Sequence, residues 1–309
     1  MSDATYFATP SVAAMALRMG VDLADVARMA GRIHIAREDV ERHVTEMNQH
    51  VKGADSSILS TPSPNDDSRF WKVDHSTFGP VTEEPLSNFA LTASCNLSAA
   101  NRTIPQVTHH DRADLRAVQA LRTRLKAEAT ERGIKLTILA FHVKALALCL
   151  EVFPQFNASL SANGKTLFVK HYRHIGIAVD TPHGLMVPVI RDVDRKGLWQ
   201  IAEDISDLAA RAQQRKVRPN EMGGASMTIS NLGGIGGIGF TPIVNPPELA
   251  ILGITRTETV PLWEDGNWNP VPMAPLDLSY DHRVINGALA ARFVAHLASM
   301  LADPREMLV

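Results

Sequence analysis

The stretch Met273-Ala-Pro-Leu-Asp-Leu-Ser-Tyr-Asp-His-Arg-Val-Ile-Asn-Gly287 decides how the C-terminal half of this chain is interpreted. Its first eight residues favour a strand. The residues that follow favour a helix with one apolar stripe, in which every fourth residue is apolar: Ile285, Leu289, Phe293, Leu297 and Leu301. His282 lies at the junction of strand and helix, where charged neighbours can fix the tautomer of an imidazole that faces a cleft. On the pattern alone, an inert surface histidine remains the alternative.

Composition limits the classes of protein to which the chain can belong. Of 309 residues, 45% are hydrophobic, which excludes a disordered chain and allows one or two folded domains. The formal net charge is −2, and no run of Lys and Arg supplies the basic face that nucleic acid requires. We therefore expect no nucleic-acid partner.

The sequence pattern shows no membrane-spanning segment, no signal peptide and no cysteine motif. The apolar run 136–152 is interrupted by charged residues and is too short to span a membrane, and the N-terminus lacks the features of a signal peptide. Cys95 and Cys149 form no CxxC pair, so neither a disulfide framework nor a zinc site is indicated. We expect a soluble, cytoplasmic protein without a membrane partner.

Changes in composition divide the chain into three parts. Residues 5–46 predict a small helical unit, with a helix that begins at Pro10, a turn or tight helix over 21–26 and a helix from about Ala36. Residues 47–74, rich in Ser, Pro and Asp, predict a linker. Residues 75–309 predict a mixed α/β domain. Its expected helices cover 111–132, 136–152 and 197–215, and its expected strands lie near 166–180, 185–190, 225–232, 248–255 and 273–280.

The C-terminal motif resembles the signature of 2-oxoacid dehydrogenase acyltransferases, the E2 components, especially the bacterial dihydrolipoamide acetyltransferases of pyruvate dehydrogenase complexes. Further motifs occur in the order typical of that family: Phe78-Gly79, Thr103–Thr108, Phe156–Ser159, Ile175–Asp180, Gly184–Arg191, Thr228–Gly233 and Asn245–Glu248. The resemblance covers about 75–309. It implies a mixed-sheet α/β (α+β) catalytic domain similar to chloramphenicol acetyltransferase, preceded by a small all-α subunit-binding domain.

The resemblance also implies a mechanism. A thiol is only slightly ionised at pH 7, so acyl transfer between thiols benefits from a base. By resemblance, His282 is that base and Ser230, 52 residues earlier in the chain, donates a hydrogen bond to the developing oxyanion. Asn286 corresponds to an Asp or Asn near the reacting centre. An N-cap role for Asn286 in the last helix is the structural alternative, and the two roles are compatible.

Other residues match positions near the substrate channel or its supporting ion pairs. Tyr280, Asp180 and Arg122 belong to this group by resemblance, and Arg283 is expected to pair with Asp281 and order the loop. The substrates implied are CoA or acetyl-CoA and a lipoyl group, which another chain or a missing domain would supply because no lipoyl domain precedes Thr9. No metal is implied.

Two motifs that suggest cofactors have simpler interpretations. Gly234-Ile-Gly-Gly-Ile-Gly239 satisfies GxGxxG, but the prolines that follow forbid the helix a dinucleotide site requires, so we expect a loop beside Ser230. His109 and His110 could suggest a metal site, yet adjacent residues of a strand point to opposite faces.

The N-terminal unit, 5–46, resembles a peripheral subunit-binding domain, which implies an E1 or E3 dehydrogenase partner. The family forms trimers with active sites between subunits, and the apolar end Met307-Leu-Val309 is consistent with docking into a cubic 24-mer. Two alternatives remain open: a free-standing CoA-dependent acyltransferase for a small acceptor, and a non-catalytic scaffold that binds partner dehydrogenases.

Overall fold

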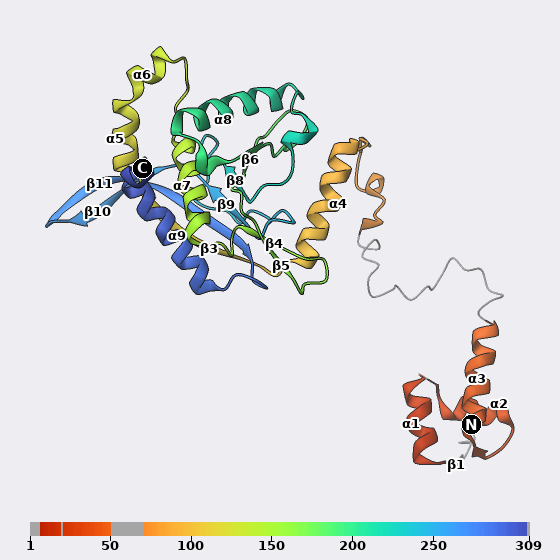
Figure 1. Ribbon diagram of the computed structural model, residues 1–309. Coiled ribbons are helices and arrows are strands. Elements are labelled where there is room, and N and C mark those ends of the chain that lie inside the picture. The colour runs from red at the N-terminus through yellow and green to blue at the C-terminus, as the bar shows by residue number, and fades with distance from the viewer. Residues whose placement is uncertain (1–6, 20, 51–70, 308–309) are drawn as a thin grey trace. The chain divides into compact units, whose positions relative to one another are not determined.

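The computed structural model describes residues 7–19, 21–50 and 71–307 (Figure 1). The chain divides into two compact units, Met1–Glu83 and Glu84–Val309. The predicted linker 47–74 lies largely outside the described residues, as do the predicted C-terminal docking residues Leu308 and Val309. Met307, which precedes them, is buried.

The small unit is helical, as predicted. It contains α1 (Pro10–Arg18), α2 (Leu23–Ala30) and α3 (Arg37–His50), together with a two-residue parallel pair of strands, β1 (Phe7–Ala8) and β2 (His34–Ile35). Its small core consists of Val12, Ala16, Val26, Ala27, Ile35 and Val40. The segment predicted as a turn or tight helix near 21–26 begins the full helix α2, and α3 extends four residues into the predicted linker.

Local hydrogen bonds explain where these helices begin and end. The Asp22 side chain accepts from the Ala24 amide (2.9 Å) and caps α2, and Gly31 ends that helix in the left-handed region at φ 60°. The buried carboxylate of Asp39 accepts from Arg32 (2.5 Å) and from the Ala36 amide (2.8 Å). These bonds hold the pKa of Asp39 below its usual value.

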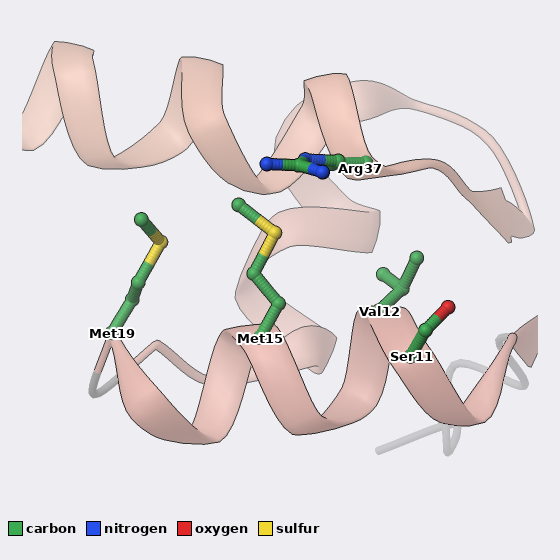
Figure 2. Close-up of a pocket in the computed structure, with 5 residues that line it drawn as sticks. All are labelled: Ser11, Val12, Met15, Met19 and Arg37. Carbon is green, nitrogen blue, oxygen red and sulfur yellow. The ribbon is translucent and has the colours of Figure 1, made fainter.

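A pocket of about 470 Å³ lies between α1 and α3 of the small unit (Figure 2). Met15 of α1 and Met19, which follows this helix, extend toward α3, where Arg37 lies, and Ser11 and Val12 complete the lining. The pocket therefore combines flexible apolar side chains with one cation.

The large unit contains a mixed sheet covered by helices. Its helices are α4 (Asn88–Thr103), α5 (Arg116–Arg124), α6 (Lys126–Glu131), α7 (Ile138–Val152), α8 (Leu198–Gln213) and α9 (Gly287–Ala302), with 3-10 turns η4 (Val193–Arg195), η5 (Pro219–Glu221) and η6 (Pro304–Met307). Its strands are β3 (Gln106–Asp114), β4 (Ala158–Leu160), β5 (Leu167–Val169), β6 (Ile175–Ala178), β7 (Val189–Ile190), β8 (Met227–Asn231), β9 (Ala250–Ile254), β10 (Glu258–Glu264) and β11 (Asn267–Asp281). A further 3-10 turn, η3 (His75–Thr77), precedes this unit in the chain.

Strand order in the main sheet is β10-β11-β9-β8-β6-β7, and β3 pairs with the other side of β11. Strands β6, β8 and β9 run parallel, whereas β11 runs antiparallel to β9 and β3. Ser230 lies opposite Ala178 on one side and Gly253 on the other. This arrangement confirms the predicted mixed α/β fold.

The two faces of the sheet differ in chemistry. One face is apolar, with Met227, Ile229 and Leu252 in the main core, and α7 and α9 lie across it (Figure 1). The predicted stripe of α9 belongs to this core, because Phe293, Leu297 and Leu301 are fully buried. Side chains alternate along a strand, so Thr228 and Ser230 lie on the opposite face.

The predicted helix over 111–132 is wrong in its first part. Residues 111–114 belong to β3, which pairs with the end of β11 from Asp114↔Met273 to Gln106↔Asp281. The remainder splits at Leu125 into α5 and α6. Strand β10 and helix α4 were not predicted. Pairing of β3 with residues more than 150 positions away is a tertiary effect that local periodicity cannot show.

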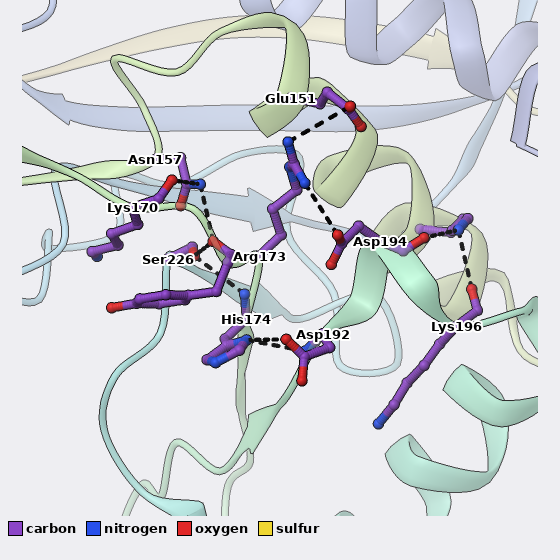
Figure 3. Close-up of polar contacts among 11 residues, drawn as sticks. Glu151, Asn157, Lys170, Arg173, His174, Asp192, Asp194, Lys196 and Ser226 are labelled. Atoms are coloured by element: carbon purple, nitrogen blue, oxygen red, sulfur yellow. Dashed lines mark hydrogen bonds and ion pairs between the residues drawn. The ribbon is translucent and has the colours of Figure 1, made fainter.

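A polar network fixes the amino end of β6 (Figure 3). Arg173 binds the Asp194 carboxylate (3.1 Å), and Lys144, whose pKa is lowered by burial, donates to the backbone oxygen of Asp194 (3.0 Å). The Ser226 hydroxyl accepts from the His174 amide (3.2 Å). The starts of β6 and β8 and helix α7 are thereby held together.

Candidate active site

His282 lies directly after β11 with an exposed side chain. Its backbone amide donates to the Pro105 carbonyl (3.1 Å), and its ring centre is 5.8 Å from that of buried Tyr280. Burial raises the pKa of Tyr280, which stays protonated near neutral pH. The histidine is thus held at its backbone while its imidazole faces outward.

The expected Arg283–Asp281 ion pair is present. The guanidinium Nη2 lies 2.6 Å from Asp281 Oδ2, and the Asp281 carboxylate is almost completely buried. The same carboxylate accepts from the Arg283 amide (3.0 Å), while the Asp281 amide donates to Leu249 O (2.8 Å). The pair therefore orders the turn that carries His282, as the sequence predicted.

Asn286 caps α9. Its φ and ψ are −91° and 162°, and its side-chain oxygen accepts from the Leu289 amide (2.9 Å). This contact confirms the structural alternative. Because the cap uses the carbonyl oxygen, the side-chain amide group is the part of Asn286 that remains for a second contact.

Ser230 lies near the carboxyl end of β8 and is partly exposed. Asp180 follows the end of β6 at the same edge of the sheet, which we call the serine edge. The opposite edge, where β11 ends at His282, is the histidine edge. Tyr280, Arg283 and Asn286 lie at the histidine edge.

Within one chain, His282 and Ser230 are far apart. Across the sheet, Ser230 of β8 is paired with Gly253 of β9, and Gly253 is paired with Asp277 of β11. Asp277 precedes His282 by five residues. Five residues at about 3.3 Å each and two strand spacings of about 4.8 Å place the two Cα atoms about 19 Å apart. The two residues therefore cannot contact one substrate atom within a single chain.

Arg122 and Asp180 serve other contacts. The Arg122 Nε donates to Leu136 O (3.1 Å), and this exposed side chain lines a pocket of about 360 Å³ together with Asn231. The Asp180 backbone oxygen accepts from Gln213 (2.5 Å). In the ranges described, neither residue forms an ion pair, so sequence similarity alone placed them beside a channel.

The glycine run 234–239 contains no helix, as predicted. After it, the Phe240 amide donates to Asp277 (3.1 Å), and the ring of Phe240 occupies the space a side chain at Gly253 would fill. Asp277 also pairs with His110 Nδ1 (2.6 Å). His110 thus anchors this loop, and no group of three or more His, Cys, Asp or Glu side chains gathers in the described residues.

Sequence reasoning missed Glu248, the last residue of the Asn-Pro-Pro-Glu motif. Its carboxyl is buried and accepts from the Thr228 hydroxyl (2.9 Å), two residues from Ser230. Burial raises the pKa of Glu248 to about 7. A glutamate after two prolines was the available signal, but only the fold shows that it is buried.

Comparison with known proteins agrees with this fold. The profile of "2-oxoacid dehydrogenases acyltransferase (catalytic domain)" matches residues 78–309. The acetyltransferase component of the Pseudomonas aeruginosa pyruvate dehydrogenase complex is 45% identical over 98% of this chain and 55% of its own length. The chain spans about half the length of the curated relatives it matches. No described helix is long and apolar enough to cross a membrane.

Solved structures give the same result. Azotobacter vinelandii dihydrolipoamide acetyltransferase is similar with a TM-score of 0.75 and 46% identity, over 77% of this chain and 98% of that one. The cubic core of a pyruvate dehydrogenase multienzyme complex gives the same values. The chain therefore belongs to the 2-oxoacid dehydrogenase acyltransferase family, with residues 78–309 as its match to the catalytic domain.

Proposed function

We propose that this chain transfers an acyl group, with acetyl the first candidate, between a dihydrolipoyl thiol and CoA. The transfer would serve a pyruvate dehydrogenase type of complex. Family membership supports the reaction class, and the 45% identity to an acetyltransferase component supports acetyl. The single observation that carries the proposal is that exposed His282, on an ordered turn, lies about 19 Å from Ser230 in one chain, which calls for a site shared between chains.

In this mechanism His282 removes the proton from the attacking thiol. The thiolate adds to the thioester carbonyl, and the oxyanion accepts a hydrogen bond from the Ser230 hydroxyl of a neighbouring copy. When the tetrahedral intermediate collapses, the carbon–sulfur bond to the leaving thiol breaks and His282 returns the proton to that sulfur. The side-chain amide of Asn286 is free to donate nearby, because its oxygen caps α9.

The relatives support this assignment of roles. The Azotobacter structure was determined to examine a serine, a histidine and an asparagine in the catalytic mechanism of that enzyme, and those residues are separated by 52 and 4 positions. Ser230, His282 and Asn286 have the same separations here. Tyr280 and Arg283 then support the histidine edge, and Asp180 and Arg122 the serine edge.

The assembly we propose is a homotrimer, which can build a cubic 24-mer like the core of the related complex. Each site would combine the histidine edge of one copy with the serine edge of the next. We further propose domains at 5–46 and 75–309 joined by a linker over 47–74. The first domain would bind E1 or E3 partners, with the lipoyl group supplied in trans or by a further domain.

The experiment that tests the reaction uses the assembled chain, acetyl-CoA and free dihydrolipoamide. We expect S-acetyl-dihydrolipoamide to form, and the His282→Ala variant to lose about 100- to 10,000-fold in rate. Turnover that survives His282→Ala unchanged would exclude this mechanism. If neither form transfers acetyl, succinyl-CoA tests whether the acyl group rather than the mechanism was misassigned.

A further inference from the structure

The carboxyl group of Glu248 is buried beside the strand that carries Ser230, and the proposed mechanism gives it no role. Glu248 is 5% exposed, and its Oε1 accepts from the Thr228 hydroxyl at 2.9 Å. Side chains alternate along β8, so Thr228 and Ser230 lie on the same face, with their Cα atoms about 6.6 Å apart. One hydrogen bond therefore links Glu248 to the face of β8 that presents the proposed oxyanion donor.

The Thr228 hydroxyl is confined on its other side. A Cβ atom at Gly176, the residue of β6 that pairs with Thr228, would lie 2.5 Å from Thr228 Oγ1. The hydroxyl thus occupies the space that a side chain at Gly176 would fill. Asn245 Nδ2 lies 3.5 Å from the same Oε1 of Glu248. These contacts hold the segment before β9 against β8.

The second carboxyl oxygen, Oε2 of Glu248, is buried and has no hydrogen-bond partner within the described ranges. Burial disfavours the charged form and raises the pKa of Glu248 to about 7. The charge of Lys170 opposes this rise, but its Nζ donates to Ala225 O (2.9 Å). On β11, the Asp281 carboxylate is paired with Arg283. Glu248 therefore changes between neutral and charged forms near neutral pH.

The charge on Glu248 matters to a reaction that develops negative charge at Ser230. In the proposed mechanism the oxyanion accepts from the Ser230 hydroxyl. A carboxylate beside Thr228 lies on the order of 8 Å from that oxyanion, and its repulsion corresponds to about a tenfold change in rate. A neutral carboxyl exerts no such repulsion and still accepts from Thr228.

We propose that Glu248 is a positioning residue for the serine edge. Its neutral carboxyl holds Thr228, and with it the strand that carries Ser230. Loss of its proton places a negative charge beside the developing oxyanion and slows acyl transfer. The inference rests on the proposed acyl transfer, to which it adds a residue that does not touch the substrate.

The test is the rate of acetyl transfer by Glu248→Gln divided by that of the parent chain, measured on assembled protein from about pH 6 to about pH 8.5. Glutamine retains an oxygen that accepts from Thr228 but does not ionise. We expect a ratio near one at the lower pH that rises to about ten at the higher pH, with its midpoint near 7. Both chains carry His282, so titration of the base cancels in the ratio.

The matched control is Glu264→Gln, which removes a carboxyl from β10 of the same sheet. The Arg116 guanidinium holds the pKa of Glu264 below its usual value, so this group stays charged over the whole range and its ratio should not change with pH. Circular dichroism at each pH checks that every chain is folded.

A second pair of variants tests the hold on β8. Thr228→Val cannot donate to Glu248 and should lower the rate about three- to tenfold even near pH 6, whereas Thr228→Ser retains the hydroxyl and should restore it. The inference is overturned if the Glu248→Gln ratio does not change with pH, if Glu264→Gln gives the same profile, or if Thr228→Val matches the parent chain.

Failure of this inference differs from failure of the proposed function. A flat ratio in an active parent chain overturns the role of Glu248 alone. If the parent chain transfers neither acetyl nor succinyl to dihydrolipoamide, the proposed function fails and the role of Glu248 fails with it.

Discussion

Two inactive variants of this protein, His282→Ala and Ser230→Ala, are expected to restore acyl transfer when they assemble together. In one chain the two residues lie at opposite edges of the sheet, about 19 Å apart along the register of β8, β9 and β11. A thiol and the oxyanion it generates lie within a few ångströms of each other. In the proposed mechanism the base and the oxyanion donor therefore come from different copies.

The size of the recovery follows from counting interfaces. Loss of the base costs about 100- to 10,000-fold, and loss of the oxyanion donor about 100- to 1000-fold, so each homogeneous variant should retain at most about 1% of the rate. In a random one-to-one mixture, about one interface in four joins an intact His282 to an intact Ser230. A random mixture should therefore reach about one quarter of the wild-type rate, and trimers purified because they carry both variants, in which one interface of three is intact, about one third.

The assay co-expresses the two variants with different affinity tags, purifies assemblies that carry both, and measures acetyl transfer from acetyl-CoA to dihydrolipoamide. Co-assembly of His282→Ala with His282→Gln is the control, because both chains lack the same half of the site. If the mixed assembly stays at the level of its parents, each chain uses its own histidine and serine and the shared site is wrong.

Three further predictions concern stability and partner binding. Asn286→Ala should lower the free energy of unfolding by about 1 kcal/mol because α9 loses its cap, whereas Asn286→Asp should retain the cap; thermal unfolding measures both. Glu248 has a pKa near 7 in the folded chain, above its ordinary value of 4.5. Between these two pH values the folded state binds more protons than the unfolded state, so the free energy of unfolding falls as the pH rises from 4.5 through 7. Glu248→Gln should thus gain stability relative to the parent at pH 8 and little at pH 4, in urea titrations at both. Asp39→Ala removes the contacts to Arg32 and Ala36. It should weaken the binding of a dehydrogenase partner to residues 5–46, which a pull-down measures, and leave the rate of acetyl transfer in the enzyme assay unchanged.

The sequence predicted best the elements that local pattern determines. The stripe of α9 and its Asn286 cap are fixed by residues that lie next to one another in the chain, and both are present. Residues 111–114 of β3 were predicted as helix because their charged sequence has no strand periodicity, and pairing with β11 creates the strand there. Likewise, Leu125 interrupts the predicted long helix although nothing in its sequence forbids continuation.

The candidate site was predictable as a set of residues but not as an arrangement. Resemblance identified His282 and Ser230, and the sequence alone identified Asn286 as a cap. The register of the sheet was needed to learn that the first two residues lie at opposite edges. Glu248 escaped because burial, which raises its pKa, depends on packing between segments distant in the sequence.

The proposed division of the site between two edges also accounts for the contacts that order the turn at His282. A base that must meet a donor on another chain cannot be positioned by contacts to that donor before assembly. Here the Asp281–Arg283 pair, the bond from the Asp281 amide to Leu249 and the bond from His282 to Pro105 fix the backbone within one copy. The imidazole stays exposed, and ordering it in advance reduces the entropy lost when the second edge arrives. Weakening this turn by Arg283→Ala should therefore lower the rate in assemblies that are otherwise intact, with the fraction of assembled protein in gel filtration unchanged.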